Sequence, residues 1–281
     1  MALRPGVESA LAGAHALPTA LSLFSLSNRV ALITGAHRGI GLEMALALAE
    51  AGAAVYCLDI PAAPDADWRT VQESAAAMPG VGRLEYVSGD VTDQKGMWAL
   101  VEEIVRKEGR IDICVAGAGI LHGAECLEYE ADDFRRVLDV NVSGVLFAAQ
   151  AVGRQMEKLG TPGSIILIAS MSGTITNRDH HWVAYNTSKS AVLQMGRSMA
   201  CELAPKGIRV NTISPGHIIT KMTREFLDKQ PGLDAKWAGL NPLGRLGRSD
   251  ELRGVALWLA SDASSFCTGS DIRVDGGHCA W

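Results

Sequence analysis

Residues 30–51 read VALITGAHRGIGLEMALALAEA, and this stretch decides the fold. Its first five residues are an apolar run short enough for a buried strand, and an apolar-rich helical pattern follows from Gly39. Between them the chain passes through Gly35 and returns to glycine at Gly39 and Gly41. A strand, a glycine-rich turn and a helix in this order predict the first unit of a parallel sheet that binds a dinucleotide.

The alternation of apolar runs and helical patterns continues to the end of the chain. We expect further strands at 53–58, 84–87, 111–116, 164–169, 208–213 and 272–274, and helices at 67–77, 93–108, 132–159, 183–203, 223–229 and 249–260. Continuously apolar strands separated by helices imply a parallel sheet covered on both faces. The fold class is therefore α/β, a Rossmann-type doubly wound sheet in a single domain. We expect this domain at 28–281, a loosely structured substrate loop at 216–247 within it, and an irregular extension at 1–27.

Composition excludes several classes of function. The chain has 281 residues, of which 48% are hydrophobic, and a formal net charge of −5, which disfavours nucleic-acid binding. It has no apolar run of membrane-spanning length. The six cysteines form no CxxC pair, so we expect free thiols and no metal site. These observations predict a cytoplasmic protein, with mitochondrial import through residues 1–27 as the alternative.

The turn at 34–41 carries the expected cofactor site. Its glycines let the turn be tight and let backbone N–H groups approach a pyrophosphate, while the helix N-terminus favours the anion. We expect cofactor contacts from Gly35, His37, Arg38, Gly39, Ile40 and Gly41.

Asp59 ends the second strand pattern, 18 residues beyond Gly41. An acidic side chain there accepts hydrogen bonds from the ribose hydroxyls and repels a 2′-phosphate, which predicts NAD rather than NADP. Arg38 argues the other way, but we expect Asp59 to dominate because no Arg or Lys follows it before Arg69. The alternative is that Asp59 merely caps a loop.

Asp90 and Val91 follow the third strand pattern, where an adenine would lie. The Asp90 carboxylate would accept a hydrogen bond from the adenine amino group, and the Val91 backbone would meet the ring edge. A turn or N-cap aspartate is the alternative interpretation of Asp90.

Residues 185–189 read Tyr-Asn-Thr-Ser-Lys within an expected helix. The spacing places Tyr185 and Lys189 on one helix face. An ammonium beside a phenol lowers the tyrosine pKa from its reference of about 10 toward the range useful for proton transfer. With Ser170 after the fifth strand pattern and Asn141 upstream, the pair predicts a site that moves a proton and a hydride between an alcohol or ketone and a nicotinamide. The alternatives are a strand-end serine and an asparagine that fills a polar gap.

Together these motifs resemble the classical short-chain dehydrogenase/reductase family, from about residue 29 to residue 281. The matching pieces are Thr34-Gly35…Gly39-Ile40-Gly41, Asn141-Val142-Ser143-Gly144, Ser170, Tyr185…Lys189, Pro215-Gly216 and Val274-Asp275-Gly276-Gly277. The resemblance implies that Tyr185 is the general acid/base and that Ser170 orients the same substrate oxygen. It implies that Lys189 lowers the Tyr185 pKa and binds the nicotinamide ribose, that Asn141 holds a water in a proton relay, and that no metal takes part. It further implies cofactor contacts from Ala116, Gly117, Pro215, Gly216, Ile218 and Thr220.

Two departures from the family pattern matter. The family usually has Asn-Asn-Ala-Gly after the fourth strand, where this chain has Ala116-Gly117-Ala118-Gly119, so side chains that would stabilise the central sheet are absent. Ser170 also lies 15 residues before Tyr185, about two more than the common spacing, which Ser172 would restore. We assign the serine role to Ser170, because Ser170-Met-Ser-Gly173 fits the family's Ser-x-x-Gly pattern and follows the strand directly.

The expected substrate class comes from the similarity of short sequence runs to those of known enzymes. The expected lining residues are His122, Thr174, Asn177, Arg178, His180, His181, Trp182, His217, Lys221, Glu225 and Trp237. Polar members of this set would grip a polyhydroxylated chain, or they are solvated loop residues. Several runs are similar to those of fungal polyol dehydrogenases and ketose reductases, which implies an NAD-dependent enzyme for a sugar alcohol and its ketose.

Two alternatives stay open. One is a dehydrogenase or ketoreductase that tailors a hydrophobic cyclic or terpenoid natural product. The other is a catalytically idle dinucleotide-binding protein, which the intact set of four residues argues against. By resemblance the partners are a small-molecule alcohol or ketone and a second copy of the chain, in a homodimer or homotetramer formed through the helices at 132–159 and 183–203.

Overall fold

The computed structural model describes residues 6–13 and 18–281. Among these residues, seven strands form one sheet in the order β3-β2-β1-β4-β5-β6-β9, and every neighbouring pair is parallel. The strands are β1 (Val30–Thr34), β2 (Ala54–Asp59), β3 (Arg83–Ser88), β4 (Ile113–Ala116), β5 (Gly163–Ile168), β6 (Ile208–Pro215) and β9 (Asp271–Val274). The α/β doubly wound fold is confirmed.

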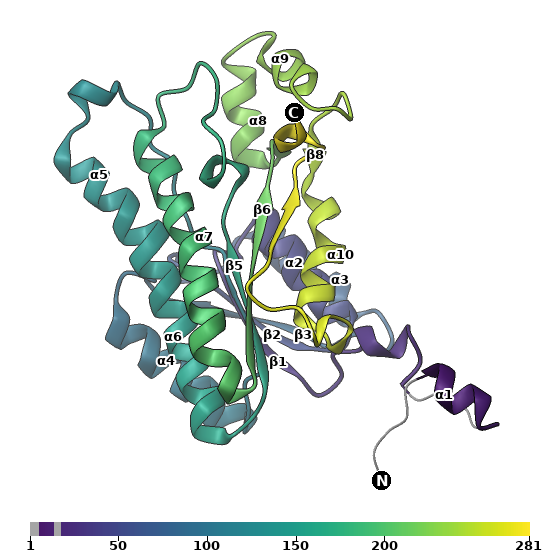
Figure 1. Cartoon of the computed structure of the whole chain (residues 1–281). Coiled ribbons are helices and arrows are strands. Elements are labelled where there is room, and N and C mark those ends of the chain that lie inside the picture. Colours follow the sequence, from purple (N-terminus) through teal and green to yellow (C-terminus); the bar gives the residue numbers. More distant parts are fainter. Residues whose placement is uncertain (1–5, 14–17) are drawn as a thin grey trace.

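Helices cover both faces of the sheet (Figure 1). One core joins the sheet to α4 (Gln94–Glu108), α6 (Val145–Leu159) and α7 (Val183–Leu203). The opposite core joins it to α2 (Gly39–Glu50), α3 (Ala66–Ala76) and α10 (Arg253–Ala260). Burial on both faces explains why the central strands are apolar throughout, as in β1, where all five residues are buried.

The direction of winding reverses at β1, whose two neighbours are β2 and β4. The chain moves outward from β1 to β3 on one side, then returns to β4 and continues to β9 on the other. A crevice forms outside the carboxyl ends of the strands at such a switch point, and ligands of open α/β sheets bind there. The loops after β1 and β4 are therefore the natural place to look for a site.

The single long helix expected at 132–159 is wrong in its middle. The structure has α5 (Ala131–Leu138), a π-helical turn at Asp139–Gly144, and then α6. The extra residue of a π-turn turns Asn141 inward, where its side chain bonds the backbone of Ile120 at both N–H and C=O. Such turns are frequent at functional sites, and no periodic sequence pattern announces one.

The segment at 216–247 is more structured than expected. It contains β7 (Ile218–Ile219), α8 (Lys221–Asp228) and α9 (Leu233–Gly239), and β7 pairs with β8 (Gly247–Arg248). In Figure 1, α8 and α9 lie beyond the carboxyl end of β6. The short α9 and the two-residue strands are too brief to produce a readable periodicity.

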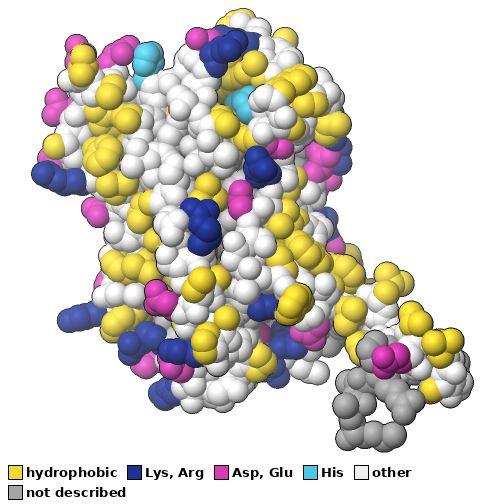
Figure 2. Space-filling view, viewed as in Figure 1, with side chains coloured by type: hydrophobic (Ala, Val, Ile, Leu, Met, Phe, Trp, Pro, Cys, Tyr) yellow, Lys and Arg dark blue, Asp and Glu magenta, His cyan; other side chains and the backbone are white. Residues whose placement is uncertain are grey.

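Within the expected extension at 1–27, the structure describes α1 (Gly6–Leu11) and a 3-10 turn at Ser22–Phe24, while residues 1–5 and 14–17 lie outside the described residues. Helix α1 projects away from the sheet, and apolar side chains gather on the projecting segment (Figures 1 and 2). Leu26 anchors the junction, since its side chain is 1% exposed and its N–H donates to the Ala51 carbonyl. Within the described ranges, no helix combines the length and apolar character needed to cross a bilayer.

Candidate active site

The turn after β1 is shaped by close backbone approach. Gly35 and Gly39 have φ angles of +71° and +58°, which side chains rarely allow. A Cβ at Gly41 would lie 2.2 Å from the Gly35 carbonyl oxygen, and one at Gly35 would lie 2.9 Å from Ala118 Cα. Only bare backbone fits here, and it leads directly into the N-terminus of α2. This is the cradle that a pyrophosphate requires, so the turn fits a dinucleotide.

Asp59 lies at the end of β2, beside this turn. Its carboxylate accepts from the backbone N–H of His37 at 3.2 Å and from that of Ile60 at 2.9 Å. The His37 ring is held in turn, because Nε2 accepts from the Asp65 N–H at 3.1 Å. Arg38 is exposed immediately before α2. The expected NAD-directing carboxylate and the basic residue opposing it thus flank the same turn, with Ile40 partly buried behind them.

Asp90 and Val91 lie after β3. The Asp90 carboxylate accepts from both the N–H and the hydroxyl of Thr92, so it stabilises its own turn, which is the alternative raised from the sequence. Val91 is 4% exposed and packs so closely on Gly144 that a Cβ there would lie 2.6 Å from Val91 Cγ2. Val91 therefore ties the turn after β3 to the π-helical turn.

The end of β4 is fastened by a residue that the sequence analysis missed. Thr34 Oγ1 accepts from the N–H of Gly117 at 3.0 Å and from that of Ala118 at 3.1 Å. This hydroxyl joins the carboxyl ends of β1 and β4, where the family's asparagines are absent. Ala116 and Gly117 remain small and close to the turn, and a Cβ at Gly117 would lie 2.9 Å from the Thr34 carbonyl.

Ser170 and Tyr185 meet beyond the end of β5. Ser170 lies directly before the 3-10 turn Met171–Gly173, and its hydroxyl accepts from the Ser172 N–H at 3.1 Å. Tyr185 lies in the first turn of α7, near enough to Ser170 for that hydroxyl to lower the Tyr185 pKa. Ser172 is 4% exposed.

Lys189 and Asn141 meet beneath them. Lys189 Nζ donates to the Ile168 carbonyl at 2.8 Å, and Asn141 Nδ2 donates to Ser188 Oγ at 3.0 Å. A Cβ at Gly119 would lie 3.3 Å from Asn141 Oδ1 and 3.6 Å from Lys189 Nζ, so both side chains border the same small space. Asn141, Ser170, Tyr185 and Lys189 are hereafter the candidate catalytic cluster.

Burial governs the ionisation of this cluster. Burial lowers the pKa of Lys189 to about 8. The pKa of Tyr185 is raised by burial and partly offset by the Ser170 hydroxyl. The Tyr185 pKa is thus raised, whereas the sequence predicted that it would fall. Lys189 Nζ turns toward Ile168 and lies 5.7 Å from the Tyr185 ring centroid. Both side chains are shielded from solvent, and when charged one is a cation and the other an anion. A charged ligand bound beside them would therefore shift both pKa values.

The segment after β6 closes the crevice from the other side. Pro215 ends the strand, and a Cβ at Gly216 would lie 2.6 Å from Asp275 Cα. Ile218 is buried, and Thr220 caps α8 by accepting from the Thr223 N–H at 3.2 Å. A Cβ at Gly39 would lie 3.6 Å from Thr220 Cγ2, so the cap of α8 faces the start of α2. Two helix N-termini thus border the turn that fits a pyrophosphate.

A row of rings connects the loops above the site. The Trp182 ring lies 6.4 Å from that of Tyr185 and stacks on His180 at 4.0 Å. Trp237 Nε1 donates to His180 Nε2 at 3.0 Å, and the Trp237 ring stacks on His217 at 4.2 Å. Burial lowers the pKa of His217 to about 3, so this imidazole is neutral at physiological pH.

The other expected substrate residues are dispersed. His122 bonds the Tyr129 hydroxyl at 2.9 Å, Arg178 is exposed, and Lys221 pairs with Asp67 at 3.7 Å. Asn177 is 3% exposed, and no described group partners either amide atom. The Glu225 side chain lies outside the described residues.

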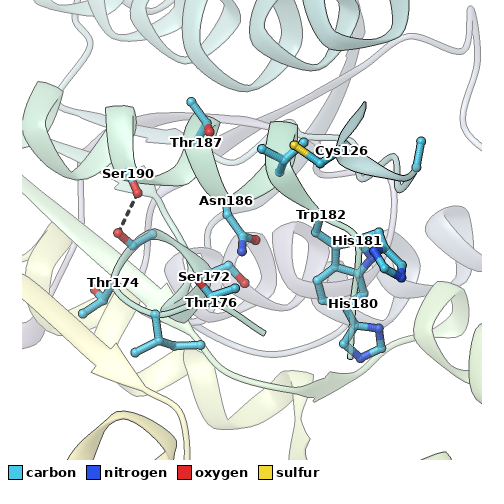
Figure 3. Close-up of a pocket in the computed structure, with 14 residues that line it drawn as sticks. Cys126, Ser172, Thr174, Thr176, His180, His181, Trp182, Asn186, Thr187 and Ser190 are labelled. Atoms are coloured by element: carbon cyan, nitrogen blue, oxygen red, sulfur yellow. Dashed lines mark hydrogen bonds between the residues drawn. The ribbon is translucent and has the colours of Figure 1, made fainter. Parts of the chain in front are cut away.

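A pocket of about 540 Å³ lies between the loop after β5 and α7 (Figure 3). Its walls come from the loop after β5, from the first turns of α7 and from the segment around Cys126. It is lined by Ala124, Cys126, Ser172, Gly173, Thr174, Ile175, Thr176, His180, His181, Trp182, Val183, Asn186, Thr187 and Ser190. The expected residues Thr174, His180, His181 and Trp182 therefore meet here, and Ser172 and Asn186 join them.

The comparisons with known proteins agree with this geometry. A family model described as Enoyl-(Acyl carrier protein) reductase matches residues 35–278. The chain is 41% identical over 268 residues to the short chain dehydrogenases/reductase notP' of Aspergillus versicolor, covering 92% of this chain and 90% of that protein. It is 41% identical over 267 residues to sorbose reductase sou1 of Schizosaccharomyces pombe, covering 92% and 99%. A crystal structure of a short-chain type dehydrogenase/reductase from Mycobacterium marinum superimposes with a TM-score of 0.86 at 42% identity, covering 92% and 99%.

This chain belongs to the short-chain dehydrogenase/reductase family. The resemblance drawn from its motifs is confirmed, and relatives of this family are oxidoreductases that act on alcohols and bind a nicotinamide cofactor. The glycine-rich turn at the start of α2 fits such a cofactor, because there is no side chain at Gly35 or Gly41 to block its approach.

Three functional candidates escaped the sequence analysis of this short-chain dehydrogenase/reductase. Thr34 looked like an ordinary strand end, although a hydroxyl at that point facing the next strand was a readable signal. Asn186 lies inside the Tyr185–Lys189 motif, where only the spacing of the end residues was considered. Ser172 was weighed as a substitute for Ser170, but not as part of a pocket wall.

Proposed function

We propose that this chain is an NAD-dependent oxidoreductase that interconverts a sugar alcohol and a ketose. The observation that carries the proposal is the convergence of the candidate catalytic cluster beside a turn of bare backbone at the switch point of the sheet. Relatives named sorbose reductase, from Schizosaccharomyces pombe, and galactitol 2-dehydrogenase (L-tagatose-forming), from Cereibacter sphaeroides, support the substrate class.

The proposed roles follow from contacts. Tyr185 exchanges the hydroxyl proton of the substrate, and Ser170, whose hydroxyl lowers the pKa of Tyr185, orients the same oxygen. A bound nicotinamide would supply the hydride acceptor or donor. Lys189 is anchored on the Ile168 carbonyl, and its cationic form would stabilise the Tyr185 phenolate if the amine turned toward it.

Asn141 has a narrower role than a free amide would have. Its Nδ2 already donates to Ile120 O and Ser188 Oγ, and its Oδ1 accepts from the Ile120 N–H. Only the second lone pair of Oδ1 remains for a water that would link Lys189 to solvent.

The preference for NAD rests on Asp59. Its carboxylate is fixed by two backbone N–H groups beside the turn, where a 2′-phosphate would meet its charge. A relative from Hypocrea jecorina is named NADP-dependent mannitol dehydrogenase, so relatives differ in this respect. Replacing Asp59→Ser should shift the NAD/NADP ratio of kcat/KM toward NADP by about 10–100-fold. A wild-type preference for NADP that Asp59→Ser leaves unchanged would refute this assignment.

The two alternatives find less support. The relatives named after a ketose and a sugar alcohol favour a polyol over a hydrophobic cyclic or terpenoid product. An idle dinucleotide-binding protein would not need the contacts that hold Lys189 and Asn141 in place.

The test is NADH and NADPH production by the purified protein with pentitols, hexitols and cyclic or terpenoid secondary alcohols at alkaline pH. Turnover of a pentitol or hexitol with NAD supports the proposal. Silence on every polyol, together with turnover of a hydrophobic alcohol, refutes it in favour of the tailoring enzyme.

We also propose a homodimer or homotetramer in the cytoplasm. Six free cysteines, two of them buried, support a reducing compartment. Light scattering coupled to size exclusion tests the assembly, and a monomer at micromolar concentration would contradict it.

A further inference from the structure

The row of rings above the site joins two segments that are distant in the sequence. The rings of His180 and Trp182 are stacked at 4.0 Å with an interplanar angle of 6° (Figure 3). Both residues belong to the loop after β5. The rings of His217 and Trp237, stacked at 4.2 Å and 13°, belong to the segment after β6. The row therefore connects the segments that leave the carboxyl ends of two neighbouring strands.

A hydrogen bond joins the two halves of the row. Trp237 Nε1 donates to His180 Nε2 at 3.0 Å. The preceding residue of α9, Lys236, donates from Nζ to Asp179 Oδ2 at 2.7 Å. Two consecutive residues of α9 thus hold two consecutive residues of the loop after β5. Both members of the ion pair are about half exposed, so it contributes little, whereas Trp237 is 5% exposed and its bond is shielded from water.

On the loop side, the row leads to the candidate catalytic cluster. The Trp182 ring lies 6.4 Å from the Tyr185 ring, at an interplanar angle of 75°. Trp182 directly precedes α7, whose first turn carries Tyr185, and the same loop begins at Ser170. His180 is therefore packed against the ring that lies beside the proposed proton-transfer group.

On the other side, the row holds the segment expected to meet the nicotinamide. His217 directly precedes Ile218, and its carbonyl accepts from the Gly247 N–H at 2.9 Å. Neither nitrogen of its ring has a hydrogen-bonding partner among the described residues, and burial lowers its pKa to about 3. Packing therefore holds this neutral ring, by the parallel stack on Trp237 and the edge of His278 at 5.2 Å.

We propose that Trp237 and His180 are positioning residues for hydride transfer. Their hydrogen bond keeps the segment 216–220, where the nicotinamide is expected, at a fixed separation from the loop between Ser170 and Tyr185, where the substrate oxygen is expected. A misplacement of about 1 Å can lower a transfer rate about 100-fold. Both residues act through their neighbours and not on the reacting atoms. The inference rests on the proposed function in one respect, namely that the chain transfers a hydride between a nicotinamide and a carbonyl carbon.

The hydrogen bond depends on the charge of His180. Nε2 accepts only while it carries no proton, so the neutral ring has its proton on Nδ1. Burial lowers the pKa of His180, as does Lys236 from α9. Within its own loop, Asp179 opposes this shift and His181 adds to it. The buried His217 ring, from the segment after β6, is neutral. The bond is therefore intact in neutral solution, and acid breaks it by protonating Nε2.

The test compares variants that each keep or remove one feature of the row. His180→Gln keeps an acceptor for the indole N–H but does not titrate, whereas His180→Leu removes the acceptor. Trp237→Phe keeps a ring for the stack on His217 and removes the donor. Trp258→Phe in α10 is the matched control, because Trp258 Nε1 donates to the Ala263 carbonyl at 3.1 Å, outside the row.

Reduction of L-sorbose and of cyclohexanone is measured with saturating NADH from about pH 4.5 to about pH 8, and urea unfolding is measured for each variant. In neutral solution we expect His180→Leu and Trp237→Phe to lower kcat by about 10–100-fold, with KM within about two-fold. His180→Gln should keep at least about a third of the wild-type kcat. The wild-type kcat should fall in acid below pH 6.5, and His180→Gln should lack this fall. Trp258→Phe should match the wild type in kcat and in pH profile.

The outcomes separate this inference from the proposed function. If His180→Gln is as slow as His180→Leu, or keeps the fall in acid, the inference fails while the proposed function stands. A wild-type kcat that stays level down to about pH 4.5, or a change confined to KM, also overturns it. If the variants lose only unfolding free energy, as the control does, the row is structural and the inference fails.

Two ketones distinguish the remaining cases. Hydride transfer is common to both, so the losses are expected with either one that the wild type reduces. If the wild type reduces cyclohexanone and not L-sorbose, the ketose part of the proposed function fails, and the variants still decide this inference. If it reduces neither, the proposed function and the inference fail together.

Discussion

The turn at 34–41 and the pocket along 172–190 are built on opposite principles. The turn is one contiguous stretch whose surface is backbone, with a Cβ excluded at Gly35 and Gly41 by neighbouring main-chain atoms. The pocket is formed by side chains from the β5 loop, the start of α7 and the segment around Cys126. A site made of backbone is fixed by the fold and can recur with little change in many relatives. A site made of side chains on separate segments can change its ligand while the fold stays the same.

The largest expected effect comes from a change to the candidate catalytic cluster. Tyr185→Phe removes the hydroxyl that would carry the substrate proton and leaves the turn untouched. We expect turnover to fall by about 10²–10⁴-fold while the Kd for NADH stays within about two-fold. Initial rates and fluorescence titration with NADH check the two arms. Residual turnover above about a tenth of the wild type would mean that another group transfers the proton.

A second prediction tests whether the turn depends on bare backbone. Gly41→Ala places a Cβ that in the native geometry would be 2.2 Å from the Gly35 carbonyl oxygen, so the turn must move. We expect a loss of about 3 kcal/mol in the free energy of unfolding and weaker NADH binding. Gly254→Ala in α10 is the matched control, because no atom lies within 4 Å of its added Cβ. The control should gain up to about 1 kcal/mol. Equal responses at the two glycines, measured by urea unfolding, would refute the steric argument.

A third prediction concerns the hydroxyl that joins β1 to β4. Thr34→Val keeps the shape of the side chain and removes the acceptor for the Gly117 and Ala118 N–H groups. We expect a loss of about 2 kcal/mol in the free energy of unfolding. Thr70→Val, at an exposed position of α3, should change it by less than about 0.5 kcal/mol. If the two variants unfold at the same urea concentration, Thr34 is not the fastening that its contacts indicate.

The smallest expected effect is the pH dependence of the free energy of unfolding that Lys189 causes. The buried amine releases its proton at a pKa of about 8, against 10.5 for the ordinary side chain. Between these values the unfolded chain holds a proton that the native chain lacks, so Lys189 makes stability rise with pH across this window, by about 1 kcal/mol per unit. Below about pH 8 both states are protonated and the slope vanishes. In the cofactor-free protein, the stability of the wild type relative to Lys189→Met should therefore increase from pH 8 to pH 10. Parallel curves for the two proteins would contradict the burial argument.

The turn at 34–41 and the elements beside it could be predicted from the sequence, because the patterns that indicate them lie in contiguous stretches. The strand at 30–34 and the helix at 183–203 were expected with the bounds that the structure gives, since their apolar patterns are long or unmixed. The order of strand, glycines and helix placed the turn correctly. The meeting of Asn141 with Lys189 was expected only through the family resemblance.

The rest depends on contacts between distant segments. The π-helical turn at 139–144 exists where Asn141 reaches Ile120, a pairing that no period in the sequence encodes. The Tyr185 pKa was expected to fall by spacing on the helix, yet burial and the position of Lys189 Nζ decide its direction. Asn186 and Ser172 line one pocket only because the loop after β5 lies across α7.

The most direct test is a crystal structure of the Tyr185→Phe variant with NAD and a hexitol bound. The account predicts one hydroxyl of the hexitol within about 3 Å of Ser170 Oγ and the pyrophosphate of NAD at the turn 34–41. A hexitol with no hydroxyl within about 4 Å of Ser170 Oγ, or a pyrophosphate bound away from this turn, would contradict the account.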